Sequence, residues 1–287
     1  MSKPSDYRVS QVGDWHLVAL PVQWNADLER RVLERVHAEP WAEHPSTIAL
    51  KDGGGVSGLH VKIFHRPQGI SALKDLAHQS KARRFWRQSL LLSKYGFDVP
   101  RVIAAGEQRR RRFLQRGFVV TESIAGQAIP TYLKAREGSR SNRETLALKR
   151  DGLKQLAGLI RRFHQCGFVH GDLVATNILV FASPKDGLKL YFMDNDRTRL
   201  YPSWLPQLLW KRNLVQLNRM PLPGISLQDR MRFLHTYLDK RQFSAGDRKL
   251  MHWLEAKTRR RRKECDGVDP SMDFRRLMRW LPEPERQ

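Results

Sequence analysis

Cysteine and long apolar runs are scarce in this chain of 287 residues. Its two cysteines, Cys166 and Cys265, are too few for a disulfide framework or a cysteine-rich metal site, which is typical of a reducing compartment. No run approaches the ~18 apolar residues of a membrane-spanning helix. The apolar stretch near the N-terminus, residues 17–22, contains Pro21 and is too short for a secretory signal. We therefore expect a soluble, cytoplasmic protein.

Acidic residues are also few relative to basic ones. The chain has 52 Lys and Arg against 29 Asp and Glu, a formal net charge of +23. This surplus predicts attraction to a polyanion, and nucleic acid, an acidic membrane surface and a phosphorylated substrate all remain possible on charge alone. Hydrophobic residues make up 40% of the chain, which is enough to build a packed core.

Short β-type runs dominate the first 122 residues. The first two runs flank Gly53, Gly54 and Gly55 and predict a glycine-rich hairpin. An arginine-rich segment between the last two predicts a solvated hairpin tip. The expected strands are residues 47–50, 60–64, 101–105 and 118–122, and the expected tip is residues 109–112.

Helical periodicity appears mainly in the second half of the chain. Helices are expected at residues 27–36, 74–94, 152–166 and repeatedly after residue 204, and two strands at residues 178–180 and 188–193. This order predicts an α+β protein with a hinge near residues 122–126. We expect a small β-rich N-terminal lobe, residues 1–122, and a larger helical C-terminal lobe with a basic tail, residues 123–287.

A polar loop between a helix and a strand carries the residues with the clearest chemistry. It contains His170, Asp172 and Asn177, and Asp194 follows the next expected hairpin. Phosphoryl transfer needs a positioned nucleophile and divalent cations that neutralise the phosphate oxygens. An aspartate can accept the hydroxyl proton, while amide and carboxylate oxygens can bind Mg²⁺. Taken singly, each residue is more often a turn-former, but together they predict Asp172 as catalytic base and Asn177 and Asp194 as metal ligands.

The same segment resembles the catalytic loop of the protein-kinase-like superfamily, in which His-Arg-Asp is followed by Asn. The match is closest to the lipopolysaccharide core (Kdo/heptose) kinases, and it covers roughly residues 51–219. The residues that carry it are His170-Gly171-Asp172-Leu173, Asn177-Ile178-Leu179, Phe192-Met193-Asp194-Asn195-Asp196 and the segment 210–219. This resemblance implies a protein-kinase-like two-lobe fold and ATP with Mg²⁺ as cofactors. It also implies transfer of the γ-phosphate to a sugar hydroxyl (Kdo or heptose) of the lipopolysaccharide inner core.

The resemblance also implies a nucleotide site in the N-terminal lobe. One strand lysine corresponds to the lysine that holds the α- and β-phosphates, three glycines to the loop that covers them, and residues 119–124 to the linker whose backbone contacts adenine. The expected nucleotide-binding residues are Lys62, Gly53, Gly54, Gly55, Glu122 and Ile124.

One position departs from the kinase pattern. The helix after Lys62 should offer a glutamate as its partner, yet residues 81–88 contain no acid and Phe85 occupies the expected place. Asp75 is the nearest carboxylate in the expected helix. The departure leaves open a non-catalytic, kinase-like binding protein as an alternative function.

The excess of basic over acidic residues helps to predict what the protein binds. It suits an anionic acceptor in a membrane, so we expect lipopolysaccharide core or a lipid A-linked precursor, and an acidic membrane surface on the cytoplasmic face of the inner membrane. The basic segments 257–263 and 275–280, with Trp253 and Trp280, would form that contact, and a solvated basic helix face is the alternative interpretation of them. A kinase for aminoglycoside- or choline-like molecules is a further alternative, which the basic charge disfavours. No motif for specific nucleic-acid binding is present.

Overall fold

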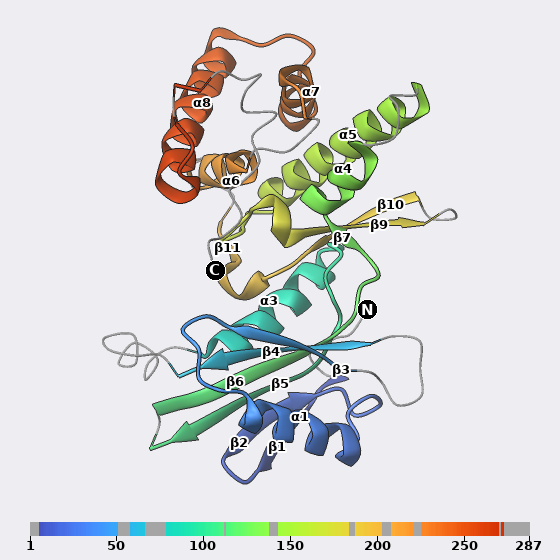
Figure 1. The fold of residues 1–287 in the computed structure, drawn as a ribbon, viewed down its shortest axis with the longest axis vertical. Coiled ribbons are helices and arrows are strands. Elements are labelled where there is room, and N and C mark those ends of the chain that lie inside the picture. Colours follow the sequence, from blue (N-terminus) through green and yellow to red (C-terminus); the bar gives the residue numbers. More distant parts are fainter. Residues whose placement is uncertain are drawn as a thin grey trace. The chain divides into compact units, whose positions relative to one another are not determined.

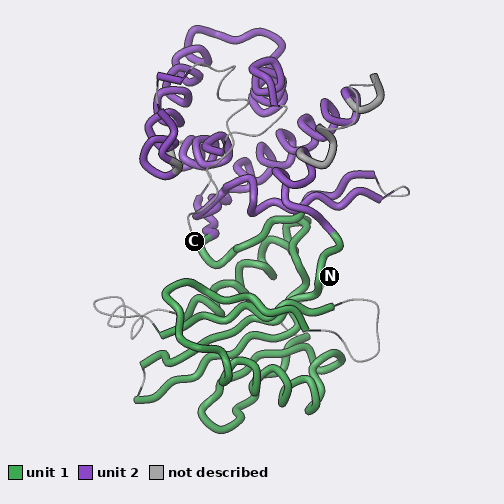
Figure 2. The backbone as a smooth tube through the Cα atoms, viewed as in Figure 1, with its two compact units in different colours: residues 1–125, 191–197 green, residues 126–190, 198–287 purple. Residues whose placement is uncertain are grey.

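The chain forms two compact units in its computed structural model. The first comprises Met1–Ala125 and Tyr191–Arg197, and the second Gly126–Leu190 and Thr198–Gln287 (Figure 2). The expected division into lobes at residues 122 and 123 stays a prediction. The structure describes residues 6–50, 58–66, 79–111, 113–137, 143–183, 187–202, 208–220, 225–269 and 271–272.

The first unit is built on a six-stranded antiparallel sheet in the order β1-β2-β5-β6-β4-β3 (Figure 1). Its strands are β1 (Arg8–Val12), β2 (Trp15–Ala19), β3 (Ser46–Leu50), β4 (Leu59–His65), β5 (Val102–Arg110) and β6 (Phe113–Glu122). The four strands expected from the sequence are present, and β5 and β6 extend toward the arginine-rich tip. At that tip Arg111 takes a left-handed φ of 48°, which lets Arg110 pair with Phe113.

The hairpin β1–β2 was not expected from the sequence. Its first strand lies at the sheet edge and is mostly exposed, so it lacks the alternation that marks a half-buried strand. Its second strand buries Trp15 and Leu17, and Gly13 makes the turn with a φ of 56°. The turn dipeptide Gly13-Asp14 before an apolar run was the signal that could have identified this hairpin.

Two helices accompany this sheet. Helix α1 (Ala26–Ala38) confirms the expected periodicity, because Leu28, Val32 and Val36 are its buried residues, and the Asn25 side chain caps its start. Helix α3 (Lys81–Lys94) confirms most of the second expected helix, but Gln79 and Ser80 lie before it and the Ser80 side chain caps its start; residues 74–78 lie outside the described residues. At Gly106 of β5 an added Cβ would collide with the Phe118 ring, so packing requires glycine here.

The second unit is mainly helical. It contains β7 (Gln127–Ala128), α4 (Ile129–Glu137), α5 (Arg143–Gln165), β8 (Phe168–Val169), η2 (Ala175–Asn177), β9 (Ile178–Ser183), β11 (Arg199–Leu200), α6 (Leu208–Arg219), α7 (Leu227–Leu238) and α8 (Ala245–Asp266). Strand β10 (Gly187–Phe192) begins here and passes into η3 (Asn195–Arg197) of the first unit. The prediction that α5 begins at Gly152 was wrong, because this glycine lies inside the helix and is tolerated there.

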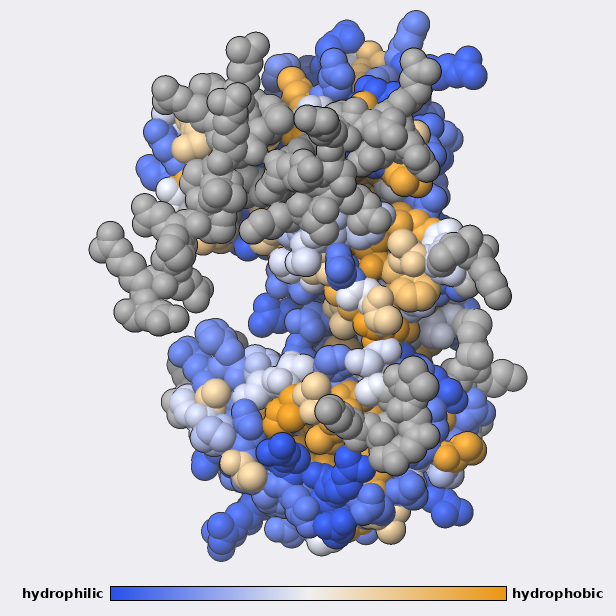
Figure 3. All heavy atoms as spheres, turned by 45° about the vertical axis from the view of Figure 1, so that its right-hand side comes forward, coloured by the Kyte–Doolittle hydropathy of each residue, from blue (hydrophilic) through white to orange (hydrophobic). Residues whose placement is uncertain are grey.

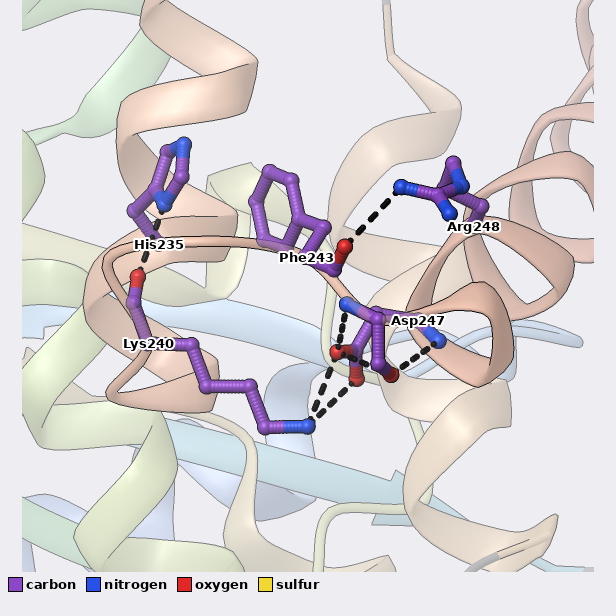
Figure 4. A network of polar contacts seen from close by, with 6 residues as sticks. His235, Lys240, Phe243, Asp247 and Arg248 are labelled. Atoms are coloured by element: carbon purple, nitrogen blue, oxygen red, sulfur yellow. Dashed lines mark hydrogen bonds and ion pairs between the residues drawn. The ribbon is translucent and has the colours of Figure 1, made fainter.

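The α7–α8 connection is held by a compact network of polar contacts (Figure 4). Lys240 Nζ lies 2.8 Å from both carboxylate oxygens of Asp247, and its carbonyl oxygen contacts the His235 ring at 2.7 Å. The hydrogen bond from Lys240 lowers the pKa of Asp247 to about 2. Asp247 also completes a capping box with Ser244 at the start of α8. The C-terminal end of α7 is therefore fixed.

Helix α8 contains the whole of the first expected membrane-binding segment, and the basic side chains of this segment have different environments. Arg262 is 3% exposed and donates to the carbonyl oxygens of Asn218 and Arg219, each at 2.7 Å. It therefore caps the C-terminal end of α6 and cannot contact a membrane. Arg260 and Arg261 are exposed but pair with Glu264.

Hydrophilic residues predominate on the face in Figure 3. Among the described residues, no helix combines the length and apolarity needed to cross a bilayer.

Candidate active site

The polar loop begins at a glycine that no other residue can replace without strain. Gly167 follows α5 with a φ of 88°, and an added Cβ would collide with the carbonyl oxygen of Tyr201. The backbone N–H of Tyr201 donates to the Gly167 carbonyl at 2.8 Å, which joins β11 to the start of the loop. This close approach of two backbones fixes where the loop leaves the helix.

Asp172 and Asn177 lie in one hydrogen-bonded turn. The Asn177 Nδ2 group donates to the backbone carbonyl of Asp172 at 2.9 Å, and the Val174 N–H donates to the same oxygen at 3.0 Å. The Asp172 N–H donates to Nδ1 of His170 at 3.1 Å. These bonds use the backbone of Asp172, so its partly buried carboxylate is available for a substrate hydroxyl. They also direct the amide oxygen of Asn177 away from the turn, as a cation ligand requires.

Two side chains of α6 hold the backbone on both sides of Asp172. Asn213 accepts the His170 N–H at 2.9 Å and donates to the His170 carbonyl at 2.5 Å. Gln216 donates to the Gly171 carbonyl at 3.1 Å and accepts the Leu173 N–H at 3.3 Å. The sequence marked residues 210–219 by resemblance only, and these roles were missed because they join segments 43 to 45 residues apart.

The side chains of Asn213 and Gln216 form a clamp on the backbone around Asp172, and a buried histidine contacts this clamp. Nε2 of His164 lies 3.2 Å from Asn213 Oδ1, and its Nδ1 lies 2.8 Å from the hydroxyl of Tyr237 on α7. The indole of Trp210 stacks on the imidazole ring. Burial lowers the pKa of His164 to about 4, so the ring is neutral at physiological pH.

The first unit brings Lys62 and Asp194 together. Lys62 of β4 donates from Nζ to Asp194 Oδ1 at 2.6 Å, across 132 residues of sequence. The lysine side chain is 19% exposed and that of the aspartate 45%, so the pair is accessible at one end. Asp194 has a left-handed φ of 53°, a conformation that aspartate adopts more readily than most residues and that is common at functional sites.

Within the described residues, the carboxylate that pairs with Lys62 does not come from α3. The Phe85 side chain of α3 is 4% exposed and belongs to the core. Among the described residues, the ion-pair partner of Lys62 is Asp194. Asp196 also lies within electrostatic range of Lys62, and burial raises its pKa. Asp75 lies outside the described residues.

The expected adenine-binding segment lies at the end of β6. The backbone N–H of Glu122 donates to the Arg101 carbonyl at 2.9 Å, and the Glu122 carboxylate accepts from Gln23 at 3.0 Å. The Glu122 N–H is therefore engaged within the protein, and its carbonyl stays a predicted contact. Ile124 is partly buried, and its role too stays a prediction. Gly53, Gly54 and Gly55 lie outside the described residues.

The lipopolysaccharide kinase (Kdo/WaaP) family model matches residues 67–237, more than half of the chain. The chain belongs to this family. It is therefore a phosphotransferase that uses ATP and acts on a sugar hydroxyl of the lipopolysaccharide inner core. This membership confirms the family resemblance of the catalytic loop and excludes the aminoglycoside- or choline-like alternative.

A known protein sequence and a solved structure are similar to this kinase over most of its length. The lipopolysaccharide core heptose(I) kinase WaaP of Pseudomonas aeruginosa is 24% identical over 245 residues, which is 82% of this chain and 90% of that protein. A solved structure of WaaP in complex with acyl carrier protein has a TM-score of 0.61 at 22% identity, over 85% of this chain and 98% of that chain. The similarity to the solved WaaP structure confirms the expected α+β, protein-kinase-like fold.

Asn177, in the second unit, and Asp194, in the first, stay predicted ligands of a cation that would be held largely by substrate phosphates. Asn177 and Asp194 offer the hard oxygen atoms that Mg²⁺ prefers. Within the described ranges, no group of three or more His, Cys, Asp and Glu side chains could hold a metal ion by itself. Mg²⁺ commonly takes one or two protein ligands together with nucleotide oxygens and water.

Proposed function

We propose that the kinase transfers the γ-phosphate of ATP to a heptose hydroxyl of the lipopolysaccharide inner core. The observation that carries this proposal is the backbone clamp on Asp172, whose carboxylate has no hydrogen bond or ion pair with the residues that the structure describes. The heptose acceptor is supported by the name of the Pseudomonas relative. Kdo is the second candidate, because the family description includes it.

In the proposed reaction Asp172 accepts the proton of the sugar hydroxyl as its oxygen bonds to the γ-phosphorus. The bond between that phosphorus and the β–γ bridging oxygen breaks, and ADP leaves. Lys62 stabilises the α- and β-phosphates, and Asn177 and Asp194 would hold Mg²⁺. Bound Mg²⁺ would neutralise charge on the phosphate oxygens. Gly53, Gly54, Gly55 and the backbone of Glu122 and Ile124 complete the proposed nucleotide site.

Purified kinase, Mg²⁺ and radiolabelled ATP are incubated with two acceptors, Kdo₂-lipid A and its heptose-extended form. We expect transfer to the heptose-bearing acceptor at least about a hundredfold faster, because a site built around a sugar hydroxyl rejects acceptors that lack it. Transfer to Kdo₂-lipid A alone would make the protein a Kdo kinase. No transfer to either acceptor, with ATP bound, would favour the non-catalytic alternative.

The same assay tests an acidic membrane surface as a partner. Exposed basic residues of α8, among them Lys257 and Lys263, would attract the kinase to anionic lipid on the cytoplasmic face of the inner membrane. Transfer should therefore be faster when the acceptor lies in anionic vesicles than in neutral ones, and added salt should remove the difference. Equal rates would argue against this localisation. The segment 275–280 lies outside the described residues.

We further propose that the kinase binds an acyl carrier protein, as the structurally similar WaaP does. The second unit contains an apolar pocket of about 400 Å³ among α4 to α8 that suits an acyl chain. Its lining includes Leu156, Leu214, Leu217, Leu234, Met251 and Leu254.

A charge introduced into this pocket should weaken binding of acylated carrier protein. We expect Leu234→Glu to raise the Kd by at least about tenfold, because burying a carboxylate costs more than the lost acyl contact. Leu148→Glu, at a leucine of α5 that is 57% exposed, is the matched control. Calorimetry measures the Kd of both variants for acylated and for non-acylated carrier protein. Equal binding of the two carrier forms would exclude the pocket as the acyl site.

A further inference from the structure

A chain of hydrogen bonds connects α7 to the peptide group that precedes Asp172. The pairs are Tyr237 with His164 at 2.8 Å, His164 with Asn213 at 3.2 Å, Asn213 with Gln216 at 3.0 Å, and Gln216 with Gly171 at 3.1 Å. These residues come from α7, α5, α6 and the loop. The chain therefore joins three helices to one backbone carbonyl.

Every hydrogen bond in this series is donated in the same direction, from Tyr237 toward Gly171. The His170 N–H donates to the Asn213 amide oxygen, which fixes the orientation of that amide. His164 must then donate to the same oxygen from Nε2, and its neutral ring accepts the Tyr237 hydroxyl proton at Nδ1. Asn213 Nδ2 donates to Gln216, and Gln216 Nε2 donates to Gly171. Aligned donors polarise one another, so each bond strengthens the next.

The middle of this hydrogen-bond series, at His164 and Asn213, is buried, whereas its last bond, from Gln216 to Gly171, is exposed. The exposed fractions of His164 and Asn213 are 2% and 1%. Without its histidine partner, the side-chain amide of Asn213 would have little access to solvent and its orientation would be less restrained. The orientation of Asn213 therefore depends on the side chains behind it.

The position of Tyr237 is set by ion pairs near both ends of α7. Lys149 of α5 lies 2.9 Å from Asp229 in the first turn of α7, and Arg161 of α5 lies 2.9 Å from Asp239, which caps its end. The Phe233 ring stacks on the Tyr237 ring one turn away. These contacts hold the hydroxyl against His164.

We propose that Tyr237 and His164 are positioning residues for phosphate transfer, which fix the Asn213–Gln216 clamp and thereby the backbone that presents Asp172. This inference rests on the proposed function. Gly171 and Leu173 contribute the two peptide groups that flank Asp172, and Gln216 holds both. A loosened clamp lets the carboxylate sample orientations that miss the hydroxyl proton, which lowers kcat without changing ATP binding.

Tyr237→Phe is the decisive variant because it removes one oxygen and keeps the ring. We expect kcat to fall about fivefold, the equivalent of one lost hydrogen bond, with the KM for ATP within about twofold of the unchanged protein. His164→Phe should lower kcat about twentyfold, because it removes two bonds, and His164→Gln should recover part of the loss by donating to Asn213 again. In the His164→Phe background, Tyr237→Phe should have no further effect.

Thr236→Val is the matched control. Thr236 neighbours Tyr237 on α7, and its hydroxyl donates to the Arg232 carbonyl of the same helix at 3.1 Å. Its kcat should equal that of the unchanged protein. A melting temperature for every variant separates loss of fold from loss of positioning.

Amide hydrogen exchange tests the inference independently of the acceptor. The His170 and Leu173 amides should exchange about fivefold faster in Tyr237→Phe and unchanged in Thr236→Val. Faster exchange in a protein without transfer activity would support the positioning role while the proposed function fails. Unchanged kcat and unchanged loop exchange in Tyr237→Phe, whatever its melting temperature, would overturn the inference.

Discussion

Asp172→Ala lowers kcat for phosphate transfer by at least about a thousandfold, because the variant has no carboxylate to accept the hydroxyl proton. We expect Asp172→Asn to lose nearly as much, since an amide keeps the shape but is a poor base. Neither variant should change the melting temperature by more than a few degrees. The bonds of Asp172 to His170, Val174 and Asn177 use its backbone and persist in both variants.

Asp151→Asn is the control for this loss. Asp151 lies on α5 with a side chain 64% exposed, and the substitution removes the same charge from the same unit. Its kcat should be unchanged. If Asp172→Asn retained more than about a tenth of the activity, another group would be the base and the assigned role of Asp172 would be wrong.

Arg262→Leu is expected to destabilise the kinase by about 3 kcal/mol. The substitution removes two charge-assisted hydrogen bonds and leaves the carbonyl groups of Asn218 and Arg219 without these donors in a partly buried place. Burial, together with repulsion from Arg262, lowers the pKa of nearby Arg230 to about 10. Relief of that repulsion offsets part of the loss. Denaturant unfolding with a constant m-value measures the difference.

Arg260→Leu tests whether position or charge accounts for this effect. Arg260 lies on the same helix with a side chain 72% exposed, and its solvent-exposed ion pair with Glu264 contributes little to stability. Arg262→Lys should remain destabilised, because an ammonium group cannot span two carbonyl oxygens as the guanidinium does. Equal stability of the Arg262→Leu and Arg260→Leu variants would contradict the capping role.

Local patterns identified much of the fold and the residue types of the candidate site. The spacing of Leu28, Val32 and Val36 was sufficient for α1, because one apolar face determines how an amphipathic helix packs. The catalytic loop was recognisable because its polar residues lie within a few positions of one another. Gly152 led to a wrong predicted start for α5, since the helix is stabilised by packing that a single glycine does not disrupt.

Contacts between distant segments could not be predicted. The pair Lys62–Asp194 joins residues 132 positions apart, and the bond from Tyr237 to His164 spans 73 positions. Each partner is an ordinary polar residue in its own segment, and only the folded chain brings the two together. Arg262 was misjudged for the same reason, because its sequence neighbours indicated a charged surface while tertiary packing buries it.

The order of segments along the chain also affects synthesis of the kinase on the ribosome. The first unit needs residues 191–197 for completion, and these emerge only after much of the second unit. Until then Ser89 of α3 lacks its contact with Asn195, a residue that is fully buried in the finished protein. A nascent chain therefore carries an unfinished N-terminal unit while later helices form, and domain-by-domain folding in chain order is not available to it. A fragment ending at residue 125 would keep an unfinished N-terminal unit permanently.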